Sequence, residues 1–198
     1  MLEPSAMLAR LDAATREHHA ELDAYWLDLM AQGVTSELYS AQLVRVYGFE
    51  APLESALAYT PGFVVADRRD LTRSGLIVQD LIALGMKAAA ASRLGQANIA
   101  PFATPQEALG WWYVSERQSQ LYNSIKRHLV SRIPQVANAC AFLGSYDGVA
   151  AARWQQLGSV LDAQAWKHGH EAILAAAHDA FQHAVTWFRG TQQVARGA

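Results

Sequence analysis

The chain has 198 residues, of which 52% are hydrophobic and 17% are charged, a composition typical of a globular protein with a buried core. We therefore expect residues 1–198 to form a single domain, with residues 194–198 frayed. Sixteen basic and eighteen acidic side chains give a formal charge of −2, which excludes a chain-wide basic surface for nucleic acid.

The first predicted helix begins near Ser5, a residue that can cap it, and ends near Gln32, ahead of Gly33. Such a helix should bury one face, because its apolar or neutral positions recur three and four residues apart. These positions are Leu8, Leu11, Thr15, Leu22, Trp26 and Leu29.

Two adjacent histidines, His18 and His19, lie in the middle of this helix. Stepping back from Trp26 at helical spacing reaches His19, whereas stepping forward from Leu11 reaches His18, so periodicity does not choose between them. The inward histidine is either a hydrogen-bonded core residue or a neutral imidazole that binds a metal or haem iron. The pattern leaves both alternatives open.

A second helix is predicted over residues 37–59, opened by Thr35 or Ser36. Pro52 falls inside this helix, removes one backbone hydrogen bond and crowds the carbonyl four residues earlier. We therefore expect either a kink over residues 48–52 or a break into two pieces.

A third helix is predicted over residues 67–84, where leucines and an isoleucine recur at helical spacing and Gly85 provides a stop. Residues 86–104 combine an alanine run, which favours a helix, with prolines, which do not. We expect an irregular connection with one short helix in this stretch.

Thr104 and Pro105 form a favourable opening for a fourth helix, which should run to about Arg132. Six consecutive polar residues, 115–120, interrupt its apolar pattern. At about 100° per residue they sweep more than a full turn, so at least one must point inward. The inward residue either makes a local hydrogen bond or forms the polar wall of a ligand cavity.

The remaining sequence predicts a short helix over residues 134–142, a turn over 144–148, and two closing helices over 149–161 and 163–193. No stretch alternates between apolar and polar residues as a half-buried strand does. The chain is therefore expected to be all-α.

Cys140 is the only cysteine, which excludes an intrachain disulfide and a cysteine-rich metal site. The first residues lack a basic segment followed by an apolar run, so we expect no signal peptide. No window approaches the roughly eighteen apolar residues of a membrane span. A cytoplasmic protein is the resulting expectation.

A series of short motifs in a fixed order gives the chain a resemblance to the haem oxygenase family, in particular the bacterial, phytochrome-associated type that produces biliverdin. The first motif, residues 11–19, resembles the family's L-x-x-A-T-x-x-x-H proximal segment and aligns His19 with its haem ligand. Residues 80–85 are similar to its D-L-x-x-L-G, and residues 110–116 to its distal G-x-x-Y-V-x-E. The family then carries G-S-T-L-G-G, whose three glycines are replaced here by Arg117, Leu121 and Tyr122.

The resemblance implies a single-domain, haem-oxygenase-like helical bundle that opens haem oxidatively to biliverdin, carbon monoxide and ferrous iron. Haem would be both substrate and cofactor. Electrons would come from an external donor such as ferredoxin or a reductase, and a bacteriophytochrome could receive the biliverdin. No nucleic acid or membrane is implied.

The same resemblance assigns roles to individual residues. His19 would be the axial iron ligand, oriented by Glu17 or Glu21, while Arg117 and Gln118 would form the distal hydrogen-bond network. The remaining residues expected to hold the cofactor, five of them cations for the propionates, are Tyr113, Arg10, Arg16, Lys126, Arg127 and Arg153.

Two other interpretations use the same scaffold. Loss of the distal glycines, which permit close backbone approach, is compatible with a protein that binds haem or another tetrapyrrole without catalysis. A non-haem di-iron oxidase is suggested by Asp179 and His183, four residues apart on one helix face, with Glu50 and Glu54 as further ligands.

Overall fold

The computed structural model describes residues 5–63 and 72–196, with side chains as far as residue 191. These ranges contain helices and connections and no strand, which confirms the all-α prediction. Within them, no helix is both long enough and apolar enough to cross a membrane. The helical elements are α1 (Ala6–Leu27), η1 (Asp28–Met30), α2 (Ser36–Tyr59), α3 (Ser74–Ala83), α4 (Ala88–Ala91), α5 (Pro105–Gln118), η3 (Ser119–Leu121), α6 (Tyr122–Arg132), η4 (Pro134–Ala139), α7 (Ala141–Gly144), α8 (Ala150–His168) and α9 (Glu171–Arg196).

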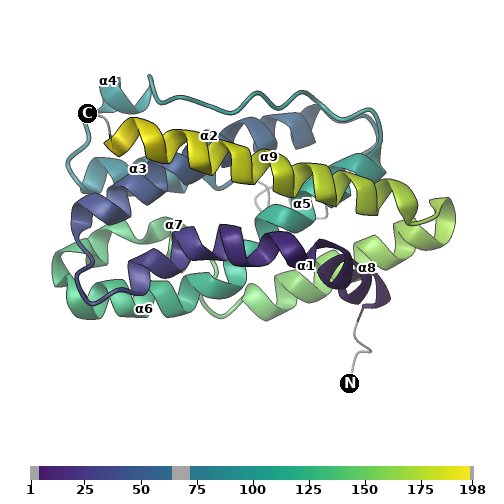
Figure 1. The fold of residues 1–198 in the computed structure, drawn as a ribbon, viewed down its shortest axis with the longest axis horizontal. Coiled ribbons are helices and arrows are strands. Elements are labelled where there is room, and N and C mark those ends of the chain that lie inside the picture. The colour runs from purple at the N-terminus through teal and green to yellow at the C-terminus, as the bar shows by residue number, and fades with distance from the viewer. Residues whose placement is uncertain (1–4, 64–71, 197–198) are drawn as a thin grey trace.

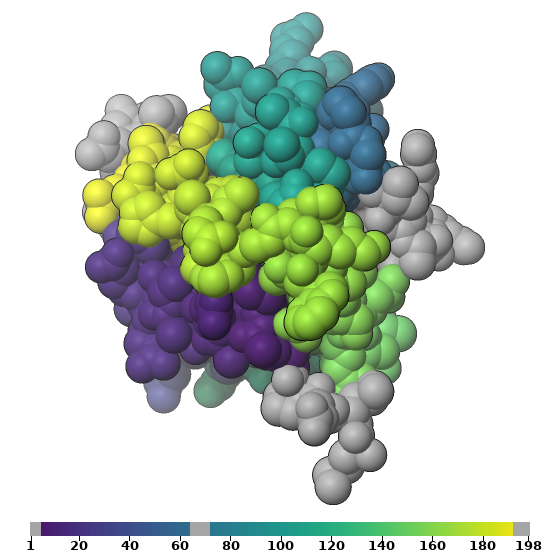
Figure 2. Space-filling model, turned by 90° about the vertical axis from the view of Figure 1, so that its right-hand side faces the viewer, coloured from purple at the N-terminus to yellow at the C-terminus, as the bar shows by residue number. Residues whose placement is uncertain are grey.

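The last helix, α9, runs along the length of the bundle and packs mainly on α5 and α1 (Figure 1). Its contact with α5 is closest at Gly110, where an added Cβ would lie 2.6 Å from the backbone nitrogen of Ala177 and the carbonyl oxygen of Ile173. No side chain fits between the two backbones there. On the other side, α1 and α9 adjoin at the surface of the molecule (Figure 2).

Three predicted helix openings are confirmed by their capping bonds. The side chain of Ser5 accepts a hydrogen bond from the backbone of Leu8, and Thr35 and Thr104 make the equivalent bonds at the starts of α2 and α5. Pro105 occupies the first turn of α5, where its missing N–H costs nothing. Capping bonds to residues three positions away therefore determine where these three helices begin.

Helix α2 continues through Pro52, so of the two predicted alternatives, a kink or a break, the break is excluded. Because Pro52 has no N–H, the carbonyl of Gly48 loses its helical partner, and the backbone N–H of Ala97 replaces it at 2.7 Å. The extended connection that carries Ala97 can approach α2 because Gly48 has no side chain. An added Cβ on Gly48 would lie 2.6 Å from the carbonyl oxygen of Gly95.

Helix α3 begins at Ser74, later than the predicted start, and residues 67–71 of the prediction lie outside the described ranges. The connection after α3 contains one short helix, α4, as expected.

The predicted fourth helix is interrupted. Helix α5 ends at Gln118, a 3₁₀ turn follows at residues 119–121, and α6 continues to Arg132. The hydroxyl of Ser119 donates to the carbonyl of Glu116 at 2.6 Å, a local bond that competes with regular helix geometry. The chain thus leaves α-helical geometry at the segment where the haem oxygenases carry glycines.

The predicted boundary between the two closing helices is also wrong. Helix α8 passes through Asp162 to His168, and Gly169, with φ of +81°, separates it from α9. The Asp162 carboxylate accepts a hydrogen bond from the backbone of Met7 at 2.8 Å, so it caps α1 rather than opening a new helix. In place of one short helix over 134–142, the chain forms η4 and α7.

Candidate functional site

Helix α1 turns His19 inward and thereby resolves the choice between the two histidines. His19 is 9% exposed, and its ring lies 5.3 Å from the ring of Phe181 on α9. His18 is half-buried and faces His178, also on α9. His18, the neighbour of the predicted ligand His19, is therefore not a fully solvated side chain.

Both ring nitrogens of His19 face residues of α1 itself. Nε2 lies 2.9 Å from the Thr15 hydroxyl, and Nδ1 lies 3.7 Å from the Asp12 carboxylate. The Thr15 hydroxyl donates its one hydrogen to the carbonyl of Leu11 at 2.8 Å, so the Nε2–H of His19 donates to Thr15. Iron binding at Nε2 requires the other tautomer, in which the proton sits on Nδ1 and faces Asp12.

The surroundings of His19 favour its neutral form. Burial lowers its pKa below the ordinary value of 6.5, and the Arg117 guanidinium lowers it further, while Asp12 and Asp23 act in the opposite direction. A neutral imidazole is the form that binds a metal.

Tyr113 lies on α5, opposite His19, with its ring fully buried. Burial raises the pKa of its phenol to about 12. The hydroxyl lies near enough to Thr15 to be affected by it, yet no hydrogen bond of normal geometry forms at this oxygen among the described residues. A buried hydroxyl of this kind indicates a missing partner beside the Thr15–His19 pair.

The two predicted distal residues bridge directly to α1. The Arg117 guanidinium binds both carboxylate oxygens of Asp23, at 2.7 and 3.0 Å. The indole N–H of Trp26 donates to the amide oxygen of Gln118 at 2.7 Å, and both side chains are buried. The predicted proximal and distal segments do face each other, but their side chains close the space between them.

Glu17 and Glu21 do not orient His19. Glu17 lies 3.5 Å from His18, and Glu21 binds Arg189 of α9. The carboxylate nearest the His19 ring is Asp12, two turns earlier on the same helix face.

The predicted propionate cations are spread over the molecule. Arg10 and Arg16 are exposed on α1, and Arg16 lies 3.9 Å from Asp12. Lys126 binds Asp147 and, with Arg127, lines a separate cavity of about 680 Å³ beside α6.

The fifth predicted cation, Arg153 of α8, belongs to a buried network instead. Its guanidinium lies 4.6 Å from the centre of the Tyr146 ring and 3.9 Å from Glu116. The structure thus brings His19, Tyr113, Arg117 and Gln118 together at one interface, whereas Arg153 has its partners elsewhere.

Sequence reasoning missed the centre of this network, Arg73, which immediately precedes α3. Arg73 is 3% exposed and lies 2.8 Å from Glu50 and 3.3 Å from Glu116, and it also bonds the hydroxyl of Ser115. Two of the inward polar residues of α5 are therefore paired with a cation from the residue that precedes α3. The two glutamates one turn apart on α2, Glu50 and Glu54, were the available sign of a buried cation.

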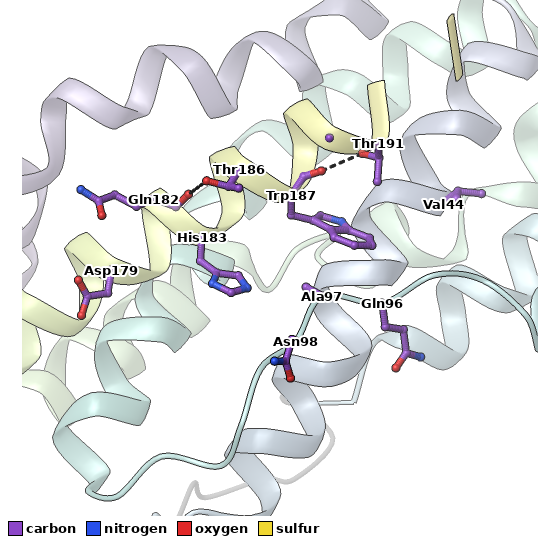
Figure 3. Close-up of a pocket in the computed structure, with 11 residues that line it drawn as sticks. Val44, Gln96, Ala97, Asn98, Asp179, Gln182, His183, Thr186, Trp187 and Thr191 are labelled. Carbon is purple, nitrogen blue, oxygen red and sulfur yellow. Dashed lines mark hydrogen bonds between the residues drawn. The ribbon is translucent and has the colours of Figure 1, made fainter. Parts of the chain in front are cut away.

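These contacts remove the ligands that a di-iron site would need. Glu50 is paired with Arg73, and Glu54 accepts hydrogen bonds from the backbone of Arg73 and Ser74. Asp179 and His183 instead line a groove of about 970 Å³ between α9 and residues 96–98, together with Trp187 (Figure 3). Among the described residues, these four do not gather into a metal-binding group.

No family model matches this chain, and no curated protein is significantly similar to it.

Proposed function

We propose that this chain is a haem-oxygenase-like protein that binds haem through His19, and that its distal side chains keep it from degrading the haem. The observation that carries the proposal is the buried Tyr113 hydroxyl, which lies close to Thr15 but makes no hydrogen bond of normal geometry among the described residues. A buried polar atom that lacks a partner at the interface of α1 and α5 suggests a site that receives a ligand.

The donor at this interface fits a haem iron. His19 is buried, its pKa is lowered, and Asp12 is placed to accept a hydrogen bond from the Nδ1–H once Nε2 is used for the metal. Thr15 releases Nε2 by giving up one neutral hydrogen bond, which costs on the order of 1 kcal/mol.

The opposite face does not fit oxygen activation. Arg117 is bound to Asp23 and Gln118 to Trp26, so neither is free to order oxygen or water above an iron. When bound, haem would supply an iron that can be reduced by an external donor such as ferredoxin or a reductase. The chain's own contribution would be to hold the imidazole neutral and to exclude bulk solvent. We place this activity in the reducing cytoplasm, which suits the single buried thiol of Cys140.

Titration of the full chain with haemin, followed by its Soret band, tests the proposal. We expect a shifted band for the wild type, loss of at least about tenfold in affinity for His19→Ala, and an unchanged band for His18→Ala. Circular dichroism would verify that each variant is folded. Equal haemin binding by His19→Ala and wild type would contradict the axial assignment.

A haem oxygenase is the second candidate, favoured by the 3₁₀ turn at residues 119–121, which departs from α-helical geometry at the position of the family's glycines. Oxygen and a reductant distinguish the two. We expect the haem spectrum to persist, and formation of biliverdin would instead establish the oxygenase and refute the non-catalytic proposal.

A further inference from the structure

We propose that His18, His178 and Glu17 form a binding site for a divalent transition-metal ion, zinc in particular, where α1 meets α9. One ligand atom from each side chain lies within 4.8 Å of the others, the one such grouping found among the described residues. His19 does not belong to it, because both nitrogens of its ring face Thr15 and Asp12. The metal site is thus independent of the proposed haem ligand.

The distances are close to those in a zinc site. Nε2 of His18 lies 3.1 Å from Nδ1 of His178, and two nitrogens bound to one tetrahedral zinc lie about 3.3 Å apart. A carboxylate oxygen of Glu17 lies 3.5 Å from the same His18 nitrogen. Small side-chain rotations would bring all three atoms onto one ion.

The two facing nitrogens can be joined in two ways. Without a metal, one neutral imidazole donates its N–H to the lone pair of the other at 3.1 Å, and with a metal both lone pairs point at one ion. The Glu17 carboxylate, directed at the same point, supplies a third ligand atom for the ion.

The imidazoles are held by their surroundings. The His18 ring stacks on Phe181 at 5.8 Å between centroids and meets the His178 ring edge-on at 4.7 Å. The other nitrogen of His178, Nε2, lies 2.7 Å from the amide nitrogen of Gln182, and a flip of this exposed amide would present its oxygen to an Nε2–H instead. Such an outer hydrogen bond fixes the tautomer in which Nδ1 binds the metal.

Two histidines and one carboxylate leave the fourth position of a tetrahedral ion for water. The Glu17 side chain is 71% exposed, so an ion can reach the site from solvent without any change in the core. His18 on α1 and His178 on α9 are 160 residues apart in the chain, so the ion would join these two helices.

Isothermal titration of the full chain, first freed of metal by chelation, with zinc chloride alone tests the site. We expect one zinc per chain for the wild type and no stoichiometric binding for the His18→Ala/His178→Ala double variant. Glu17→Gln and Gln182→Ala should each weaken binding by about tenfold. The matched control is His168→Ala/His170→Ala, which removes two histidines outside the site and should leave the affinity unchanged.

Two outcomes would overturn the proposal: no stoichiometric zinc on the wild type, or equal binding by wild type and the His18→Ala/His178→Ala variant. If that variant does not fold by circular dichroism, His18→Gln with His178→Gln replaces it. His19→Ala should retain zinc while losing haem, so failure of the metal site and failure of the haem proposal are separable.

Discussion

Helix α1 carries two neighbouring imidazoles that both pack against Phe181 of α9, and its interfaces with α5 and α9 differ in how their polar groups are paired. On the α5 side, His19 lies within an interface that the Arg117–Asp23 ion pair and the Trp26–Gln118 hydrogen bond have closed. On the α9 side, His18 faces another imidazole and a carboxylate with no cation among the described residues between them. The side chains between α1 and α5 are thus paired with one another, whereas those of His18, His178 and Glu17 form the grouping that we propose to bind zinc.

We expect the largest loss of stability from a substitution in the buried centre of the interface between α1 and α5. Trp26→Ala removes a fully buried indole and leaves the Gln118 amide oxygen without its donor, and we expect the free energy of unfolding to fall by about 3–5 kcal/mol. Urea denaturation measures this. Leu27→Ala, at an adjacent position that is 51% exposed, is the control and should change stability by less than about 0.5 kcal/mol. Equal losses for both variants would show that the interface is not closed as described.

Zinc should stabilise the α9 side. At a zinc concentration about one hundred times the dissociation constant, the folded state gains about 2.7 kcal/mol, because the unfolded chain does not hold the two histidines together. The melting temperature of the wild type should rise with zinc, and that of the His18→Ala/His178→Ala variant should not. A rise of equal size in both would assign the effect to other surface residues.

Placing a glycine at position 117, where the resemblance to haem oxygenases aligns one, should loosen the interface between α1 and α5 moderately. Arg117→Gly removes a partly exposed ion pair and adds a flexible residue near the end of α5, at a cost of about 1–2 kcal/mol. Haemin affinity should then rise about five- to tenfold, because one of the contacts that must open has been removed. Arg117→Lys keeps the charge but loses the bidentate geometry, so its effect should be smaller. Unchanged or weaker haemin binding by Arg117→Gly would place haem elsewhere.

The smallest expected effect is the contribution of His19 to the pH dependence of the free energy of unfolding. Its pKa is lowered in the folded state, so the unfolded chain takes up the proton first as the pH falls. Stability is therefore complete above about pH 6.5 and decreases as the pH drops from there toward the folded pKa. His19→Asn should flatten this part of the curve in chemical denaturation at several pH values. A wild-type curve that rises on acidification would contradict the environment described for His19.

The sequence was informative where the interactions are local. Ser5, Thr35 and Thr104 cap helices by bonds to residues three positions away, and such bonds can be read from spacing. The sequence did not decide between a kink and a break at Pro52, because the N–H that replaces the missing bond comes from Ala97, in a distant connection. The replacement hydrogen bond could not be predicted because its donor and acceptor are far apart in the sequence.

The candidate site follows the same rule. Periodicity left open whether His18 or His19 faces inward from α1. The packing of His19 against Phe181 and its contact with Thr15 decide the question. The burial of Arg73 could not be predicted, because no sequence pattern marks a buried arginine. Its burial depends on ion pairs with Glu50 on α2 and Glu116 on α5, which are distant in the sequence.

Gly110 bears on which helix would move if haem bound as proposed. Because the backbones of α5 and α9 touch at this residue, we expect those two helices to stay together, so that α1 would have to separate from α5. A zinc ion at His18 and His178 would tether α1 to that same body and so oppose the separation. The two ligands would then be thermodynamic antagonists, and the factor by which zinc weakens haem must equal the factor by which haem weakens zinc.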